Sequence, residues 1–83
     1  MSIFAEFSAC KESGTNADSA EAQALVAKLQ THITESYYTC TDEILAGLGK
    51  MYVADERFKE NIDKYGEGTA EFVSAAIDVY CKN

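Results

Sequence analysis

The sequence contains no proline, few basic residues and no long apolar run. Seven lysines and arginines against fourteen acidic residues give a net charge of −7, which predicts that this chain alone repels nucleic acid and anionic membranes. Its apolar runs are far shorter than the roughly 20 residues that span a bilayer. The first residues, MSIFAEF, lack the basic start and long apolar core of a secretory signal. We therefore expect a cytoplasmic protein that does not contact membranes.

The cysteines form no short pair. Cys10, Cys40 and Cys81 are an odd number and are widely separated, which argues against a disulfide framework or a zinc ribbon. With His32 they would be the ligands of any Cys₃His zinc site, but structural zinc sites usually contain at least one short ligand pair. We therefore predict reduced thiols and no metal or other cofactor.

Apolar residues recur at helical spacing, and no segment shows the alternation of a strand. The polar segment from Ser13 to Ser19 separates the first two predicted helices, and Asp18 with Glu21 resembles a capping box. The pattern predicts one all-α domain over residues 1–83, with about five short helices. Their apolar stripes are Ile3, Phe4, Phe7 and Cys10; Ala22, Leu25, Val26, Leu29, Ile33 and Tyr37; Ile44, Leu45, Leu48, Met51 and Tyr52; Phe58, Ile62 and Tyr65; and Phe72, Val73, Ala76, Ile77 and Tyr80.

Capping residues and glycines mark the predicted helix ends. Thr41 and Asp55 are expected to cap the third and fourth helices, and Gly66 is expected to end the fourth. Gly47 and Gly49 fall inside the third helix, where each costs about 1 kcal/mol relative to alanine. Their predicted use is the close approach of another helix or of a ligand.

The segment GLGKMYVADERFKENIDKYGEG, at residues 47–68, and HITESYYTC, at residues 32–40, resemble a known family. They are similar to the TipA-type antibiotic-recognition (TipAS) domain, the effector-binding part of MerR-family transcriptional activators. The run M-Y-V-A-D-x-R-F-x-x-N-I-D-K-Y-G is a dense match, and the resemblance extends from about Ser19 to Tyr80. It implies a globin-like all-α fold with a surface cleft for bulky antibiotics. Thiopeptides are the notable case, because their dehydroalanine tails can be captured covalently by a cysteine.

The resemblance also implies the partners. DNA would be bound through a separate upstream helix-turn-helix domain, and the full-length protein would be a homodimer through a coiled coil, both absent from this sequence. The expected function is therefore that of a drug-sensing domain, and the alternative is a stand-alone protein that sequesters antibiotic. An enzyme is not expected, because no general base or orienting carboxylate accompanies the thiols. A purely structural dimerisation module would leave a broad apolar face exposed.

Cys40 is the candidate for covalent capture. It lies at the predicted start of the third helix, where the helix dipole stabilises a thiolate, although Asp42 and Glu43 oppose this by like-charge repulsion. The alternative is a small, partly buried cysteine that fills a turn. Tyr37 and Tyr38 precede it and point about 100° apart on a helix. One is expected in the core, and the other is available to stack on a flat heterocyclic ligand.

The other predicted ligand-binding residues are His32, Met51, Tyr52 and Phe58. Tyr52 and Phe58 are expected in the core or the cleft wall, and the adaptable Met51 suits the core or a permissive pocket. His32 flanks the apolar stripe of the second helix, where a lone histidine is more often partly buried and hydrogen-bonded than a ligand contact. We expect a concave surface lined by aromatic side chains of the second to fourth helices, and no catalytic residue.

Overall fold

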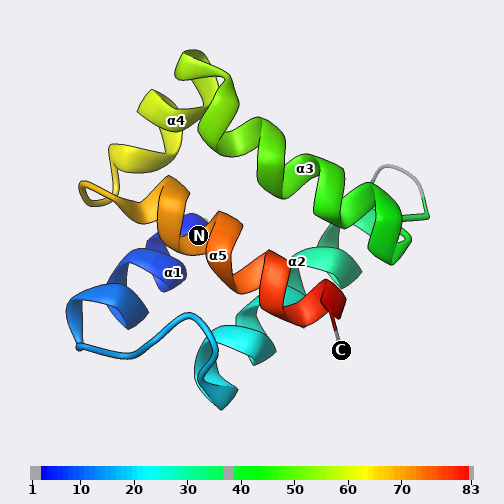
Figure 1. Cartoon of the computed structure of the whole chain (residues 1–83), viewed down its shortest axis with the longest axis horizontal. Helices are drawn as coiled ribbons and strands as arrows, with labels where there is room; N and C mark the ends of the chain where they lie inside the picture. Colours follow the sequence, from blue (N-terminus) through cyan, green and yellow to red (C-terminus); the bar gives the residue numbers. More distant parts are fainter. Residues whose placement is uncertain (1–2, 37–38, 83) are drawn as a thin grey trace.

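The structure is a computed structural model that describes residues 3–36 and 39–82 (Figure 1). Within these residues it contains five α-helices and no strand, which confirms the prediction of an all-α fold with about five short helices. The helices are α1 (Ile3–Glu12), α2 (Ala20–Ser36), α3 (Asp42–Ala54), α4 (Glu56–Asp63) and α5 (Thr69–Lys82).

Helix α5 is the central element. It packs against each of the other four helices, most extensively against α3, and the two run in opposite directions in Figure 1. Gly49 permits this contact, because a β-carbon at this position would lie 3.1 Å from Cγ2 of Ile77. The expected close approach of a helix is therefore confirmed at Gly49. At Gly47 a β-carbon would meet nothing within 4 Å.

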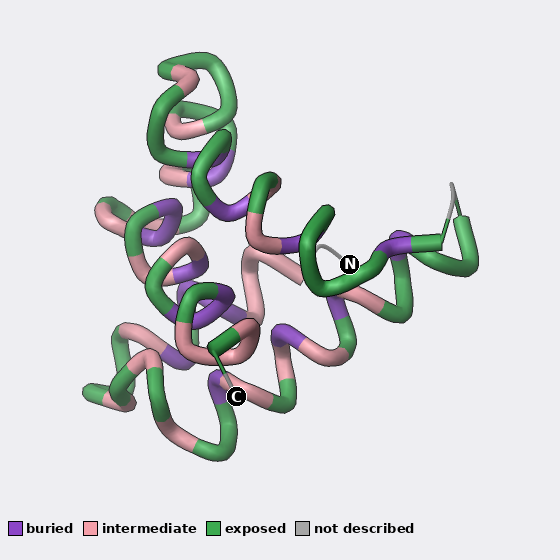
Figure 2. The backbone as a smooth tube through the Cα atoms, turned by 45° about the vertical axis from the view of Figure 1, so that its right-hand side comes forward, coloured by how far each residue is buried: buried purple, intermediate pink, exposed green. Residues whose placement is uncertain are grey.

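The core lies on the inward faces of all five helices. Along α1, α2, α3 and α5, buried positions recur among less buried ones (Figure 2), as amphipathic helices require. Two buried hydroxyls are satisfied by backbone carbonyls, since Ser8 donates to Tyr65 and Thr69 donates to Gly66, each at 2.6 Å. The largest fully buried side chains are Phe7, Leu45, Ile77, Val26, Val73 and Thr69.

Four members of the predicted apolar stripes are exposed by between 36% and 47%, namely Ile44, Met51, Phe58 and Tyr65. On α3 the reason is geometric. The buried face of α3 is centred on Leu45, Gly49 and Tyr52, and at 100° per residue Ile44 and Met51 fall on its flank. On the short α4, Ile62 is the residue that is buried.

Side chains cap the helices largely as predicted. The Thr41 hydroxyl and the Asp55 carboxylate each accept a hydrogen bond from a backbone N–H in the first turn of α3 and α4. At α2 the prediction is wrong by one residue. The Ser19 hydroxyl, not the Asp18 carboxylate, accepts the bond from the Ala22 N–H, at 3.1 Å.

The turn between α4 and α5 also differs in detail from the prediction. Gly66 does not adopt the left-handed conformation of a helix stop; Gly68 does, with φ at +83°. Gly66 is needed for space instead, since a β-carbon there would collide with the Ser8 hydroxyl. The Asp63 carboxylate braces the turn by accepting a hydrogen bond from the Ala70 N–H at 3.0 Å.

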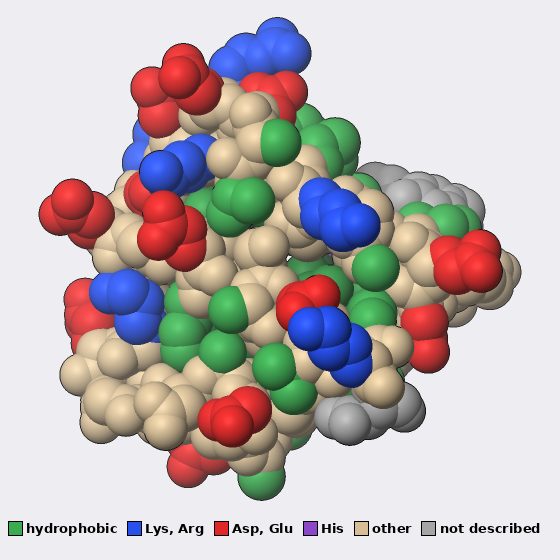
Figure 3. Space-filling model, in the orientation of Figure 1, with side chains coloured by type: hydrophobic (Ala, Val, Ile, Leu, Met, Phe, Trp, Pro, Cys, Tyr) green, Lys and Arg blue, Asp and Glu red, His purple; other side chains and the backbone are tan. Residues whose placement is uncertain are grey.

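The surface carries scattered charge. On the face in Figure 3, lysine and arginine side chains stand among acidic ones and form no continuous basic stripe. None of the helices built from the described residues is both long and apolar enough to cross a membrane. In the same part of the chain, no three His, Cys, Asp or Glu side chains are grouped to hold a metal ion.

Candidate functional site

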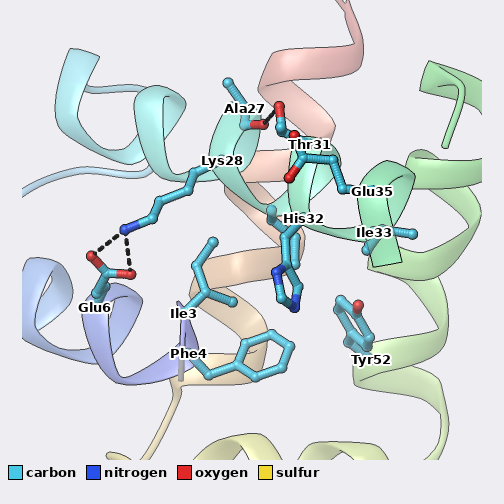
Figure 4. A pocket seen from close by; sticks show the side chains of 11 residues that line it. Ile3, Phe4, Glu6, Ala27, Lys28, Thr31, His32, Ile33, Glu35 and Tyr52 are labelled. Atoms are coloured by element: carbon cyan, nitrogen blue, oxygen red, sulfur yellow. Dashed lines mark hydrogen bonds and ion pairs between the residues drawn. The ribbon is translucent and has the colours of Figure 1, made fainter. Parts of the chain in front are cut away.

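A surface pocket of about 710 Å³ lies between α1 and α2, with one side chain of α3 at its edge (Figure 4). The residues that line it come from three segments that are distant in sequence, and the packing of the helices brings them together. They are Ile3, Phe4, Glu6, Ala27, Lys28, Leu29, Thr31, His32, Ile33, Glu35 and Tyr52.

Aromatic rings form one wall of the pocket. The rings of Phe4 and Tyr52 meet edge to face, with centroids 5.7 Å apart and planes at 87°. The Tyr52 ring also packs against Phe58, at a centroid distance of 6.1 Å. Aromatic pairs favour such geometries, so the three rings support one another. The His32 ring points from α2 toward Phe4 and Tyr52 (Figure 4).

The charged groups of the pocket lie at its rim. Lys28 of α2 reaches across to Glu6 of α1, and its Nζ lies 2.8 and 3.0 Å from the two carboxylate oxygens. Glu35 supplies a second carboxylate to the lining. An apolar interior with two carboxylates and one ammonium at the rim suits a ligand that is largely apolar and not anionic.

Two of the predicted binding residues line this pocket, His32 and Tyr52. His32 is exposed, whereas the sequence predicts a partly buried residue. Met51 and Phe58 are outside the lining, although Phe58 touches the Tyr52 ring. The predicted pair Tyr37 and Tyr38 lies outside the described residues. The pocket is built mainly by α1 and α2, not by the second to fourth helices as expected.

The other nine lining residues were not predicted as site residues, and Ile3, Phe4, Glu6 and Lys28 are the ones that shape its walls and rim. Ile3 and Phe4 belong to the apolar stripe of the first helix, and periodicity does not distinguish a stripe that enters the core from one that stops at a pocket. One signal could have pointed to the pocket. Ile3 and Phe4 are the first residues of that stripe, and neighbouring elements cover the end of a helix less than its middle. Glu6 and Lys28 carry no sequence signal, because they are 22 residues apart.

Cys40 lies on the other side of α2. The Gln30 side chain donates to the Cys40 carbonyl at 2.9 Å, and the Thr34 hydroxyl accepts from the Cys40 N–H at 3.1 Å. Gln30 and Thr34 are neighbours on one face of α2, whereas His32 projects about 160–200° around the helix from them. The residue is 4% exposed and is not part of the pocket lining.

The environment of Cys40 favours the neutral thiol. Burial, followed by the nearby Asp42 carboxylate, raises the pKa of Cys40 above its ordinary value. The same two causes, in the same order, raise the pKa of Cys81, whose thiol donates to the Asp42 carbonyl at 3.3 Å. Both effects act against the stabilisation that the N-terminus of α3 offers a thiolate, and they favour the protonated thiol of Cys40.

The chain is similar to known transcriptional activators. The HTH-type transcriptional activator mta of Bacillus subtilis is 48% identical over 64 residues, which are 77% of this chain and 25% of that protein. The HTH-type transcriptional activator TipA of Streptomyces coelicolor is 38% identical over 71 residues, which are 86% of this chain and 28% of TipA. The chain thus spans about a quarter of the length of these relatives.

The fold is similar to that of a solved antibiotic complex. The structure of TipAS in complex with nosiheptide, from a thiopeptide antibiotic multidrug resistance system of Streptomyces lividans, matches with a TM-score of 0.89 and 34% identity. The match covers 96% of this chain and 56% of the TipAS chain. A profile of the TipAS antibiotic-recognition domain matches residues 1–80. The chain therefore belongs to the TipAS antibiotic-recognition domain family, as the motifs at residues 32–40 and 47–68 indicate.

Proposed function

We propose that this chain is the drug-sensing, effector-binding domain of a MerR-family transcriptional activator, and that it recognises bulky antibiotics such as thiopeptides. The pocket between α1 and α2 carries the proposal. Its volume of about 710 Å³ lies within the range of small-molecule sites, and its walls are apolar and aromatic with few polar groups. The family of the chain and the antibiotic complex of a relative support the same assignment.

The proposed contacts follow from the positions of the side chains. His32 and Tyr52 would touch the ligand directly, together with Phe4, which lies against Tyr52. Phe58 would act by supporting the Tyr52 ring, and the exposed Met51 would meet only a ligand that extends beyond the pocket along α3. We retain Tyr37 and Tyr38 as candidate stacking residues on the strength of the family resemblance.

Binding of DNA would belong to another part of the protein. The two related activators are named for a helix-turn-helix, and this chain corresponds to about a quarter of each. Its net charge of −7 opposes direct contact with phosphates. The homodimer expected for full-length members would likewise form through a coiled coil elsewhere. Because the relatives are activators and not enzymes, a sensor is better supported than a catalyst or a sequestering protein.

Covalent capture at Cys40 is the proposed second step for ligands with a dehydroalanine tail. The Cys40 thiolate would add to the terminal alkene carbon, so that the C–S bond forms as the C=C π bond breaks. The carbanion next to the carbonyl would then take a proton from water. The tail would have to pass the C-terminal end of α2, because Cys40 and the pocket lie on different sides of this helix. Prior binding would raise the effective concentration of the alkene near the buried thiol.

Titration with nosiheptide tests the proposed pocket. We expect Phe4→Ala to weaken nosiheptide binding more than tenfold, because a buried aromatic side chain contributes about 1.5–3 kcal/mol. Tyr65→Ala is the matched control: its ring is 47% exposed and does not line the pocket, so affinity should change less than twofold. Calorimetry gives the affinity, and amide chemical shifts locate the site. Absence of binding, or shifts confined to α4 and α5, would overturn the proposal.

A further inference from the structure

The Gln30 side chain joins three parts of the fold. From α2, its Nε2 donates to the carbonyl of Cys40 and to Oδ1 of Asp42, each at 2.9 Å. Its Oε1 accepts a hydrogen bond from the Tyr80 hydroxyl of α5 at 3.1 Å. One amide therefore ties the residues that begin α3 to both α2 and α5.

The backbone of Cys40 is held on its other side as well. The Thr34 hydroxyl, one turn beyond Gln30 on α2, accepts from the Cys40 N–H at 3.1 Å. Both backbone polar groups of Cys40 are thus bonded to side chains of α2. Its thiol faces the Thr41 carbonyl at 3.8 Å, and the residue is only 4% exposed. An electrophile that is to reach the sulfur must first displace part of this arrangement.

We propose that Gln30 and Thr34 form a latch that keeps the Cys40 thiol closed, and that the fraction of molecules in which this latch is open sets how fast the thiol reacts with an electrophilic alkene. The inference rests on the capture proposed at Cys40, and it adds how access to the Cys40 thiol is controlled. Gln30 is a positioning residue in this scheme, because it acts on Cys40 and not on the ligand. Tyr80 strengthens the latch indirectly, by orienting the Gln30 amide.

The latch accounts for selectivity. A thiol that reacts only after local opening is protected from small electrophiles in proportion to the closed population. A bound antibiotic that inserts its tail beside α2 would favour the open state and so promote its own capture. Unspecific electrophiles would lack the binding energy to do so.

Alkylation by iodoacetamide, followed by peptide mapping, measures the opening without any antibiotic. The thiolate sulfur displaces iodide from the reagent, so one C–S bond forms as one C–I bond breaks. Gln30→Met keeps the length of the side chain and removes its hydrogen bonds. We expect Cys40 to react about tenfold to thirtyfold faster in this variant, because the loss of each ordinary hydrogen bond accounts for about threefold and Gln30 makes two or three of them. Cys10, which is buried elsewhere, should react at an unchanged rate.

The chain offers a matched control on the same helix. Gln23, seven residues before Gln30, makes comparable contacts, since its Nε2 donates to the carbonyl of Ala17 in the α1–α2 loop and to that of Ala76 in α5, each at 3.0 Å. Gln23→Met should therefore leave the labelling rate of Cys40 unchanged. If Gln30→Met does not fold, Thr34→Val and Tyr80→Phe each remove one bond of the latch, and each should accelerate Cys40 about threefold.

The outcomes separate the latch from the proposed function. Equal acceleration of Cys10 and Cys40 in Gln30→Met would mean general loosening and would overturn the latch, as would an unchanged Cys40 rate. If nosiheptide leaves no adduct on Cys40 while Gln30→Met still accelerates iodoacetamide at that residue alone, the capture fails and the latch stands. If the adduct forms but iodoacetamide alkylates Cys40 at the same rate in the unchanged protein and in Gln30→Met, the capture stands and the latch is wrong.

Discussion

Helices α3 and α5 pack closely, whereas α1 and α2 leave a pocket between them. In the first pair, small and apolar residues face each other, and Gly49 brings α3 within contact of Ile77. In the second pair, α2 presents Lys28 and His32 toward α1 (Figure 4). The heads of these side chains favour water, so closing the gap would bury polar groups at a cost in free energy. The type of residue on facing stripes thus decides whether two helices form core or a binding surface.

The largest expected effect lies in the closely packed region. Leu45→Ala should lower the free energy of unfolding by about 2–5 kcal/mol, because Leu45 is 0% exposed and its loss leaves a cavity. Ile44→Ala is the control from the adjacent position, where the side chain is 38% exposed. It should cost less than about 1 kcal/mol, as partly exposed sites do. Urea unfolding followed by circular dichroism measures both. Equal losses would show that α3 presents a different face to the core.

The close approach of α3 and α5 predicts the next largest effect. Gly49→Val should destabilise the protein by about 1–3 kcal/mol, because new methyl groups must displace the Ile77 side chain. Gly47→Val places the same residue two positions earlier, in open space, so the free energy of unfolding should change by less than about 0.5 kcal/mol. Thermal melts of the two variants provide the test. A neutral Gly49→Val would mean that α3 moves away from α5 easily.

Features that depend on neighbouring residues could be predicted from the sequence, and features that depend on how distant helices pack could not. Thr41 and Asp55 were predicted as caps because capping depends on neighbouring residues alone. The close contact at Gly49 followed from the cost of glycine in a helix. The pocket required more, because Phe4 and His32 line the same pocket only when α1 packs across α2, and periodicity does not specify crossing angles. The burial of Cys40 behind Gln30 depends equally on contacts between distant segments.

The pH dependence of Cys40 alkylation tests the environment of this thiol, which lies on the side of α2 away from the pocket. Burial and the Asp42 carboxylate raise the pKa of this thiol, so the neutral form dominates at pH 7. Because the thiolate is the nucleophile, the alkylation rate should rise about tenfold per pH unit between pH 7 and 8.5. Asp42→Asn removes a negative charge and keeps an acceptor for Gln30, so it should lower the pKa and raise the rate at pH 7.5. A rate that is flat above pH 7 would mean that the thiolate already dominates.

The smallest effect is expected at the rim of the pocket, from the ion pair of Lys28 and Glu6. Their atoms are 2.8 Å apart, but the Lys28 side chain is 60% exposed and the Glu6 side chain 32%. Such pairs contribute about 0.2–1 kcal/mol and weaken in salt. A double-mutant cycle of Lys28→Met and Glu6→Gln should therefore give a coupling below about 0.5 kcal/mol in 0.15 M salt.

The exposed pair of Lys82 and Asp78, also at 2.8 Å, is the control for this cycle, and its coupling should be similar. If the two couplings agree, the ion pair does not set the spacing of α1 and α2, and the gap is a consequence of the polar stripe on α2. A coupling above about 1 kcal/mol for Lys28 and Glu6 alone would assign the spacing to the ion pair. The pocket would then be expected to change its width with ionic strength, and nosiheptide affinity would follow the salt concentration.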